Sequence, residues 1–327
     1  MDLTLLMWTR VRLLYMKAPC PICKSNSDFI AYGVVAPWIS ILLNGTERRL
    51  ISTSLHKCAS CSINFFSYRY TKKELESIYK DYRTDDWYKL RHSWEPWYRE
   101  GTNNAYSGGK SEKNLDERKK WTESLLKSSG LNTENLGDYL DFGGDAGQFF
   151  PDGVQGRRIL FDLQQQQVDG IETISDPKEL TSLVSVVSSC YVLEHTPDIL
   201  EGIQEMRDCL ELNGHLLIEL PYDIFEVSSF HKKKAYLKYL GFVYKHKGLF
   251  VFSDFISGIF RQFFNRVPMF GVVKQSEHIN YFLPESVDRL LKESGFEIKY
   301  ASQPIRASFV GLIKQGKFGI VGKKVDL

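Results

Sequence analysis

The sequence predicts an α/β protein whose main domain is built on a parallel, doubly wound sheet. Three observations predict this fold. Residues 140–150, LDFGGDAGQFF, pass from an apolar strand end through an acidic residue into a glycine-rich turn. Residues 157–162, RRILFD, form a second apolar run that again ends in an acidic residue. Further short apolar runs, 171–174, 184–187 and 216–220, follow at a spacing typical of strands that alternate with helices.

The glycine-rich turn has the composition of a ligand-binding turn. Glycine is needed where the backbone takes a positive φ, or where a ligand approaches with no Cβ in the way. We expect a helix to begin directly after the turn, with free N–H groups that favour an anion. A plain strand-to-helix turn explains the glycines about equally well. The polar and glycine residues of the turn are Asp141, Gly143, Gly144, Asp145 and Gly147.

Length and composition indicate a globular chain with more than one domain. The 327 residues are 43% hydrophobic, which is enough for a substantial core. The net charge of +2 creates no overall field that would attract nucleic acid. No run of about eighteen apolar residues predicts a membrane-spanning helix. Six cysteines, four of them in close pairs, suit a reducing compartment. We therefore expect a cytoplasmic protein, with Met16 as a candidate initiator.

Two Cys-x-x-Cys pairs predict a metal site near the amino terminus. Each pair presents two thiolates to one ion, and two pairs complete a tetrahedral set. Alternating patterns at 30–35 and 50–55 predict strands that bring the pairs together, so we expect a zinc-ribbon-like module with structural zinc over residues 16–70. Four reduced thiols without metal are the alternative. His56 is expected at the surface. The predicted ligands are Cys20, Cys23, Cys58 and Cys61.

Residues 71–130 are expected to form an aromatic-rich helical linker. Thr71 and Glu74 have the spacing of a capping box at the start of a helix, whereas no period is visible beyond Asp85. The many rings between residues 68 and 98 either line a cleft that stacks on a sugar or base, or pack the small domain on the large one. A loop over 101–111 and an amphipathic helix over 114–128 complete the linker.

Residues 222–274 form an insertion after the fifth predicted strand. The stretch is rich in aromatic side chains and lysines. As a lid it would exclude water and select the substrate. The lysines and rings of residues 231–247 would suit phosphate groups or a peripheral membrane contact. A solvated helix face is the alternative explanation of the charge run.

The second half of the chain carries five motifs in a fixed order. LDFGGDAG is followed by FD at the next strand end, then by YVLEHTPD, GHLLIELP and EHINYFLPESVDRLLKESGFEI. Over residues 136–312 the chain resembles the class I S-adenosylmethionine-dependent methyltransferases. The resemblance implies a seven-stranded Rossmann-like sheet within a methyltransferase domain over 131–327, with S-adenosylmethionine as cofactor. It also implies a terminal antiparallel hairpin over 296–302 and 307–314.

The same resemblance implies which residues hold the cofactor. The glycines of the turn would cradle its methionine part, and Asp162 would hold its ribose. Asp145 stands where most members have a second glycine, so its role stays open. A nicotinamide-binding domain uses a similar turn and acid, but its G-x-G-x-x-G order is absent here. The predicted cofactor residues are Asp141, Gly143, Gly144, Asp145, Gly147, Asp162, Leu163, Tyr191 and Glu194.

The cysteine module joined to this domain resembles zinc-containing sugar methyltransferases of deoxysugar, antibiotic-sugar and surface-polysaccharide pathways. Their C-methylating members use a Tyr-His-Glu-His motif, of which only Glu277 and His278 are matched here. The chain also stops soon after the predicted hairpin, and both departures favour O-methylation. Histidine suits the removal of a hydroxyl proton at neutral pH. We therefore predict His278 as the base, Glu277 as the residue that orients it, and His195 as the alternative base.

The expected acceptor is a sugar in nucleotide-activated or glycan-bound form, and no DNA partner is expected. An RNA base methyltransferase with a zinc module is the second hypothesis, and the near-zero net charge argues against it. A non-catalytic cofactor-binding protein is the third, supported only by the departure at Asp145.

Overall fold

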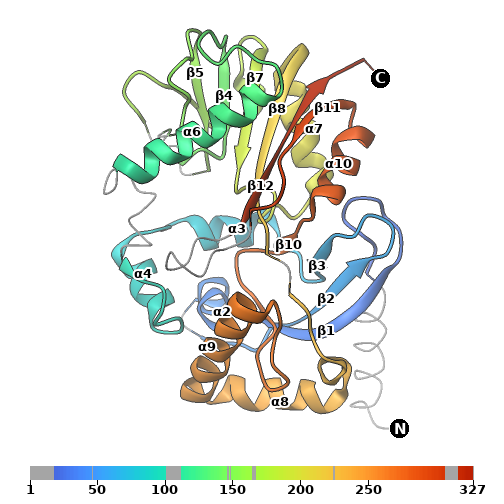
Figure 1. Ribbon diagram of the computed structural model, residues 1–327. Coiled ribbons are helices and arrows are strands. Elements are labelled where there is room, and N and C mark those ends of the chain that lie inside the picture. Colours follow the sequence, from blue (N-terminus) through green and yellow to red (C-terminus); the bar gives the residue numbers. More distant parts are fainter. Residues whose placement is uncertain are drawn as a thin grey trace. The chain divides into compact units, whose positions relative to one another are not determined.

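The computed structural model shows a chain that forms two compact units (Figure 1). The first contains the described residues of Met1–Tyr98 and Asp223–Tyr281. The second contains those of Arg99–Tyr222, Phe282–Arg306 and Lys314–Leu327. The insertion therefore groups with the cysteine-containing segment, not with the methyltransferase segment to which the sequence analysis assigned it. The structure describes residues 18–45, 47–100, 112–145, 147, 149–163, 167–223, 225–305 and 316–326.

The second unit is built on a seven-stranded sheet. The strand order is β11-β12-β8-β7-β4-β5-β6. The five strands from β6 to β8 run parallel, whereas β12 pairs antiparallel with both β8 and β11. The predicted α/β fold is confirmed. The strands are β4 (Tyr139–Phe142), β5 (Arg158–Phe161), β6 (Glu172–Ile174), β7 (Val184–Cys190), β8 (Leu210–Pro221), β11 (Phe296–Ala301) and β12 (Lys317–Lys324).

The terminal hairpin differs from the prediction in its second strand. β11 begins at Phe296 as expected, but the strand that pairs with it is Lys317–Lys324. The predicted strand, 307–314, lies outside the described residues. In β12 the central residues from Phe318 to Val321 are buried, because this strand lies between two neighbours and must be apolar on both faces.

Helices pack on the sheet of the second unit through short apolar stripes. Leu125 and Leu126 of α6 (Glu112–Ser128) lie in one core cluster with Tyr139, Val186 and Leu217 of three strands. The predicted amphipathic helix over 114–128 is therefore present, whereas the predicted loop over 101–111 lies outside the described residues. The further helices that the structure describes in this unit are η1 (Pro177–Glu179), α7 (Ile199–Cys209) and α10 (Pro284–Glu293).

The expected helix after the glycine-rich turn is not found. Residues 147 and 149–156, the part of this connection that the structure describes, form turns and one bridge between Leu136 and Val154. Pro151 and Gly153 interrupt the connection, and both residue types disfavour a helix interior. Within the described part of the turn, the N–H groups of Gly143, Asp145 and Gly147 donate to the Phe161 carbonyl, the Asp162 carboxylate and the Gly144 carbonyl.

The first unit contains a separate five-stranded sheet. Its order is β10-β3-β2-β1-β9. β1 and β2 are antiparallel neighbours, at the two places where strands were predicted between the cysteine pairs. The strands are β1 (Ser27–Val35), β2 (Ser52–Cys58), β3 (Asn64–Phe66), β9 (Lys274–Gln275) and β10 (Asn280–Tyr281).

Both edges of this sheet are supplied by the later part of the chain. β9 pairs parallel with β1, with Val34 opposite Lys274. β10 pairs antiparallel with β3, with Phe65 opposite Asn280. Edge strands leave a row of unpaired backbone groups, so the returning segment satisfies groups that the three-stranded cysteine module would expose. This pairing explains why residues 223–281 belong to the first unit.

Among the described residues of the first unit, six segments are helical. The capping box predicted at Thr71 is present, with the Thr71 hydroxyl and the Glu74 carboxylate bonded to each other's backbone N–H groups. The sequence analysis missed α4, which begins after Thr84 and buries only Trp87, so it shows no apolar period. No helix among the described residues is long and apolar enough to span a bilayer. The segments are α2 (Pro37–Asn44), α3 (Lys72–Tyr79), α4 (Asp85–His92), η2 (Ser229–Lys232), α8 (Lys234–Lys245) and α9 (Lys247–Phe264).

The aromatic residues of the linker pack into the core of the first unit. Trp38 meets Trp87 edge to face, with ring centroids 5.3 Å apart. Trp94 likewise meets Phe250 of α9 at 6.1 Å. Edge-to-face pairs of this kind add about 0.5–1.5 kcal/mol beyond area burial. The packing of these rings is internal to the first unit, which is neither the cleft nor the packing of one domain on the other that the sequence left open.

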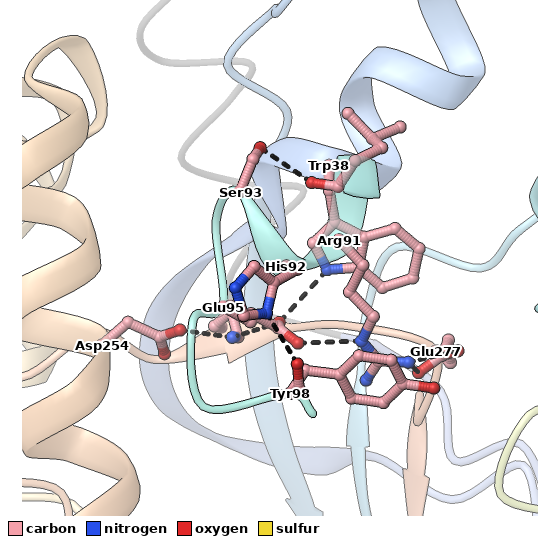
Figure 2. Close-up of polar contacts among 10 residues, drawn as sticks. Trp38, Arg91, His92, Ser93, Glu95, Tyr98, Asp254 and Glu277 are labelled. Carbon is pink, nitrogen blue, oxygen red and sulfur yellow. Dashed lines mark hydrogen bonds and ion pairs between the residues drawn. The ribbon is translucent and has the colours of Figure 1, made fainter. Parts of the chain in front are cut away.

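A buried network of five charged side chains crosses the same core (Figure 2). Arg91 binds Glu95 at 2.9 Å and Glu277 at 2.9 Å. Lys274 binds Glu95 at 2.6 Å and also binds Asp254. Burial alone would raise the pKa of Glu95, but the charges of Lys274 and Arg91 outweigh it and hold that pKa at about 2. The network thus joins α4, α9 and the segment around β9.

The position of Arg91 makes it the member whose loss should be most costly. Its guanidinium also lies over the rings of Trp38 and Tyr98, at 4.9 and 4.0 Å from their centroids. Replacing Arg91 with Met leaves two buried carboxylates without this partner. Breaking a buried ion pair in this way costs about 3–5 kcal/mol.

We expect Arg91→Met to lower the free energy of unfolding of the first unit by about this amount in urea titrations. The matched control is Lys89→Met on the same helix, where an exposed pair with Asp86 is lost. That variant should unfold like the parent protein. Equal stability of the two variants would contradict the structural role of the network.

Candidate cofactor site and cysteine cluster

The acidic residues predicted from two strand ends lie at one edge of the second sheet. β4 and β5 are parallel neighbours, with Phe142 opposite Phe161. The backbone N–H of Asp145 donates a hydrogen bond to Asp162 Oδ2 at 3.0 Å. The half-buried carboxylate of Asp162 is therefore fixed directly beside the glycine-rich turn. The predicted adjacency of the two segments is confirmed.

The backbone of the turn explains why Asp145 replaces a glycine. Gly143, Asp145 and Gly147 have φ values of +76°, +56° and +66°. Glycine adopts this left-handed region freely, and aspartate is among the few other residues that visit it routinely. The departure from the family pattern thus keeps the conformation that the position requires.

The glycines are also required by packing inside the protein. A Cβ on Gly144 would lie 2.3 Å from Asp141 Oδ2, and a Cβ on Gly143 would lie 2.5 Å from a methyl group of Val192. Contacts this short force a neighbour to move. The turn therefore packs closely on the strand ends. This packing alone requires glycine at positions 143 and 144, whether or not a ligand binds there.

Two carboxyl groups are buried at this edge with incomplete hydrogen bonding. Asp141 accepts from Ser188 Oγ at 2.8 Å, but its Oδ2 has no hydrogen-bond partner in the described part of the chain. Neither carboxyl oxygen of Glu194 has such a partner, and His195 Nε2 lies 3.9 Å away. Burial raises the pKa of Asp141 to about 6 and that of Glu194 to about 8.

Arg118 of α6 is a residue of this site that the sequence analysis missed. Its guanidinium lies 4.1 Å from the ring centroid of Phe149 and 4.7 Å from that of Tyr191. Its positive charge also lowers the pKa values of Asp141 and Glu194 against the effect of burial. One arginine within a charged helix carries no motif, so only the fold reveals this placement.

Tyr191 and Leu163 have conformations that suit a ligand-binding edge. Tyr191 follows β7 with φ +60°, an uncommon value for an aromatic residue, and its N–H donates to the Glu219 carbonyl at 2.9 Å. Such outliers cluster at functional sites. Leu163, next to Asp162, is 61% exposed. A cationic nucleoside fits these groups. The buried carboxyl oxygens of Asp141 and Glu194 suit a positive charge, and the carboxylate of Asp162 suits hydroxyl donors.

The four predicted cysteines form one cluster in the first unit. The Sγ atoms of Cys20 and Cys61 are 3.4 Å apart, as are those of Cys23 and Cys58. All four Sγ atoms lie within 4.8 Å of one another. A tetrahedral zinc site with Zn–S bonds of about 2.3 Å requires sulfur separations of about 3.8 Å. The donor set and its spacing therefore fit one such ion.

The two cysteine turns are built alike. In each, the residue after the second cysteine has a positive φ, +56° at Lys24 and +64° at Ser62. The N–H of that residue donates at 3.0 Å to the carbonyl of the first cysteine, Cys20 or Cys58. Backbone N–H groups also point at sulfur, as in Ser60 N–H to Cys58 Sγ at 3.3 Å. This geometry fixes the relative positions of the two sulfur atoms in each turn.

The prediction that His56 lies at the surface is wrong. His56 is fully buried, and its ring nitrogens contact Ser27 Oγ at 3.1 Å and Ser54 Oγ at 2.8 Å. The ring stacks on Phe65. Burial lowers the pKa of His56 to about 4, so this histidine is a neutral member of the core.

Comparison with known families identifies the second unit. A family model described as a methyltransferase domain matches residues 114–301, more than half of the chain. The chain belongs to this methyltransferase family. It is an S-adenosylmethionine-dependent enzyme whose matched region covers the glycine-rich turn, Asp162, Tyr191 and Glu194. The acceptor is not identified by the match.

Solved structures that resemble this methyltransferase are distant in sequence. The N-methyltransferase NodS from Bradyrhizobium japonicum, in complex with S-adenosyl-L-homocysteine, is 12% identical; the match covers 77% of this chain and 98% of that chain, with a TM-score of 0.37. The CurJ carbon methyltransferase is also 12% identical; the match covers 80% of this chain and 73% of that chain, with a TM-score of 0.40. No curated protein matches the sequence.

The predicted catalytic residues of the methyltransferase come from both compact units. His195 follows β7 in the second unit, where its N–H donates to the Val192 carbonyl at 2.9 Å. His278 lies half-buried between β9 and β10 in the first unit. The carboxylate of Glu277 binds Arg91 through both oxygens, so it belongs to the buried network described above. Its predicted action on His278 stays a prediction.

The buried carboxyl of Glu194 gives the methyltransferase unit a characteristic pH dependence. Its ordinary pKa is near 4.5 and its folded pKa is about 8. Between these values the folded protein holds a proton that the unfolded chain has released, so stability falls as pH rises. A difference of this size corresponds to about 5 kcal/mol at most, of which about 4 kcal/mol is lost by pH 8.

We expect Glu194→Gln to remove this dependence in urea unfolding of the second unit. The variant should match the parent near pH 5 and exceed it by up to about 4 kcal/mol near pH 8. The matched control is the exposed Glu134→Gln, which should follow the parent. If the free energy of unfolding changed between pH 5 and pH 8 by the same amount in the parent and in Glu194→Gln, the raised pKa of Glu194 would be contradicted.

Proposed function

We propose that this methyltransferase transfers a methyl group from S-adenosylmethionine to a hydroxyl group of a sugar, carried on a nucleotide or a glycan. The observation that carries the proposal is the fixed position of His278. On one side, Glu277 is bound by Arg91. On the other, the carbonyl of the buried Ile279 accepts from Phe66 N–H at 2.9 Å. A base held on a rigid segment suits the activation of a weakly acidic hydroxyl.

The cofactor would be held by the strand ends of the second unit. Asp162 would accept hydrogen bonds from its ribose hydroxyls, in the position where such an acid serves in doubly wound folds. Asp141 and Glu194 would face its positively charged methionine part, and the backbone of the turn from Gly143 to Gly147 would enclose it. When bound, the cofactor supplies an electrophilic methyl group on a sulfonium centre.

The chain itself would position the acceptor and remove its proton. Orientation of two reactants contributes several kcal/mol to a displacement reaction. In our proposal His278 accepts the hydroxyl proton, and His195 is the alternative base. Support for a sugar comes from the joining of a four-cysteine sheet to a methyltransferase domain, the arrangement in which the sequence resembles sugar methyltransferases.

The role of His278 is tested by its replacement with Ala in an assay with labelled S-adenosylmethionine and a panel of nucleotide-sugars and glycan intermediates. Loss of a general base lowers turnover by about 10²–10⁴-fold, while cofactor affinity should stay unchanged. The matched variant His195→Gln distinguishes the two histidines. Full turnover in His278→Ala, with a loss in His195→Gln, would reassign the base. Label transfer to RNA in place of the sugars would overturn the proposed acceptor.

We also propose that the cysteine cluster binds one structural zinc ion. Metal analysis of purified protein should give about one zinc per chain. Cys58→Ser should lose the metal and destabilise the first unit, because a structural site couples metal binding to folding. The control is Cys209→Ser, a buried cysteine outside the cluster, which should keep its zinc. Metal-free parent protein with unchanged stability would refute the proposal.

A further inference from the structure

The solvent-facing side of α9 is apolar along its whole length. Six large apolar side chains of this helix are exposed, with Phe252 at 65% and Phe264 at 64%. The opposite side, with Phe250, Asp254 and Ser257, is buried in the core of the first unit. The exposed residues are Leu249, Phe252, Phe255, Phe260, Phe263 and Phe264.

This pattern is the reverse of a normal surface helix. A helix on the surface of a soluble domain carries charged and polar residues on its outer side. Between Lys247 and Phe264, the two ends of α9, no charged residue is exposed, and Gln262 is the one exposed polar residue. Contiguous exposed apolar surface of this kind marks an interaction site.

The neighbouring segment supplies positive charge. Residues 232–247 contain six lysines and no acidic residue. On the exposed side of α8, Phe242 lies between Lys238 and Lys245 at helical spacing. None of the six lysines forms an ion pair within the described ranges. α8 and α9 are joined through His246 alone and lie next to each other (Figure 1).

The acidic residues of the surrounding segment are already neutralised. Asp223 binds Arg261, Glu226 binds Arg266, and the carboxylate of Asp254 binds Lys274 inside the core. Within the described residues, no acidic side chain therefore forms an ion pair with the lysines of α8, the helix next to α9. Exposed aromatic side chains next to lysines that form no ion pair in the described residues complement a lipid surface, which has an apolar interior and anionic headgroups.

We infer that α8 and α9 together dock this protein on an anionic lipid surface. The exposed phenylalanines of α9 enter the boundary between headgroups and acyl chains, and the lysines of α8 bind the lipid phosphates. Helices that lie in the interface combine these two features, and each lysine near an anionic membrane contributes to binding. The inference is independent of the acceptor and of the catalytic residues.

A lipid surface fits this face better than a second copy of the chain. A two-fold symmetric interface brings the same patch of both subunits together. Both lysine-rich segments, with twelve lysines and no acidic residue, would then lie in one interface, and like charges there oppose association. Anionic lipid supplies the opposite charge and an apolar layer at once.

The experiment is co-sedimentation of the full chain with phosphatidylcholine vesicles that contain or lack phosphatidylglycerol. We expect binding to the anionic vesicles only, weakened by salt. Phe252→Ser/Phe263→Ser and Lys238→Gln/Lys245→Gln should each lower the partition coefficient about tenfold or more. The matched controls Leu212→Ser and Lys72→Gln/Lys73→Gln replace exposed residues elsewhere and should bind like the parent.

Two results would overturn the inference. The first is a parent protein that does not sediment with anionic vesicles, or that binds no better than the two test variants. The second is a dimeric parent, seen in analytical ultracentrifugation, that Phe252→Ser/Phe263→Ser converts to a monomer while vesicle binding is absent throughout. That outcome would assign the face to contact between copies. Thermal unfolding of each variant verifies that the fold is intact. If one of the two double variants does not fold, the other still tests the inference.

Discussion

The hydrogen bond from the Asp145 N–H to the Asp162 carboxylate is the constraint on which the methyltransferase site depends. It joins the ends of two parallel strands and requires the left-handed backbone that Gly143, Asp145 and Gly147 provide. Because the turn lies against Asp141, a larger residue at Gly144 would disturb both the acid and the strand beneath it. The site is thus built on rigid strand ends, which hold functional groups more accurately than free loops.

The two units treat buried charge in opposite ways. In the first unit, Arg91 and Lys274 pair with every carboxylate of the network, so the charges stabilise packing between distant segments. In the second unit, Glu194 and one oxygen of Asp141 are buried without a hydrogen-bond partner in the described residues. Buried polar groups are normally satisfied. In the proposed function, the positively charged cofactor completes the hydrogen bonding and charge of these acids.

Features with a local signal were predictable from the sequence, and features that depend on distant pairing were not. The first five strands of the second sheet, the clustering of the paired cysteines and the Thr71 cap each depend on a few neighbouring residues, and these were predicted close to where they lie, whereas the second strand of the terminal hairpin was not. The placement of 223–281 depends on pairing of β9 and β10 with strands more than two hundred residues earlier. The buried His56 and the role of Arg118 depend on tertiary contacts alone. The helix expected after the turn is not seen in the described residues of that connection, where the breaking signal of Pro151 and Gly153 outweighs the short apolar run before them.

In the proposed function, Asp162 and the glycine-rich turn both bind the cofactor. The most direct test is calorimetric titration of the purified protein with S-adenosylmethionine, compared with Asp162→Asn and with the exposed Asp169→Asn as matched control. Loss of charge-assisted hydrogen bonds to the ribose should weaken binding about tenfold or more in Asp162→Asn, with the control unchanged. A parent protein without affinity for the cofactor, or equal affinity in Asp162→Asn, would contradict the account.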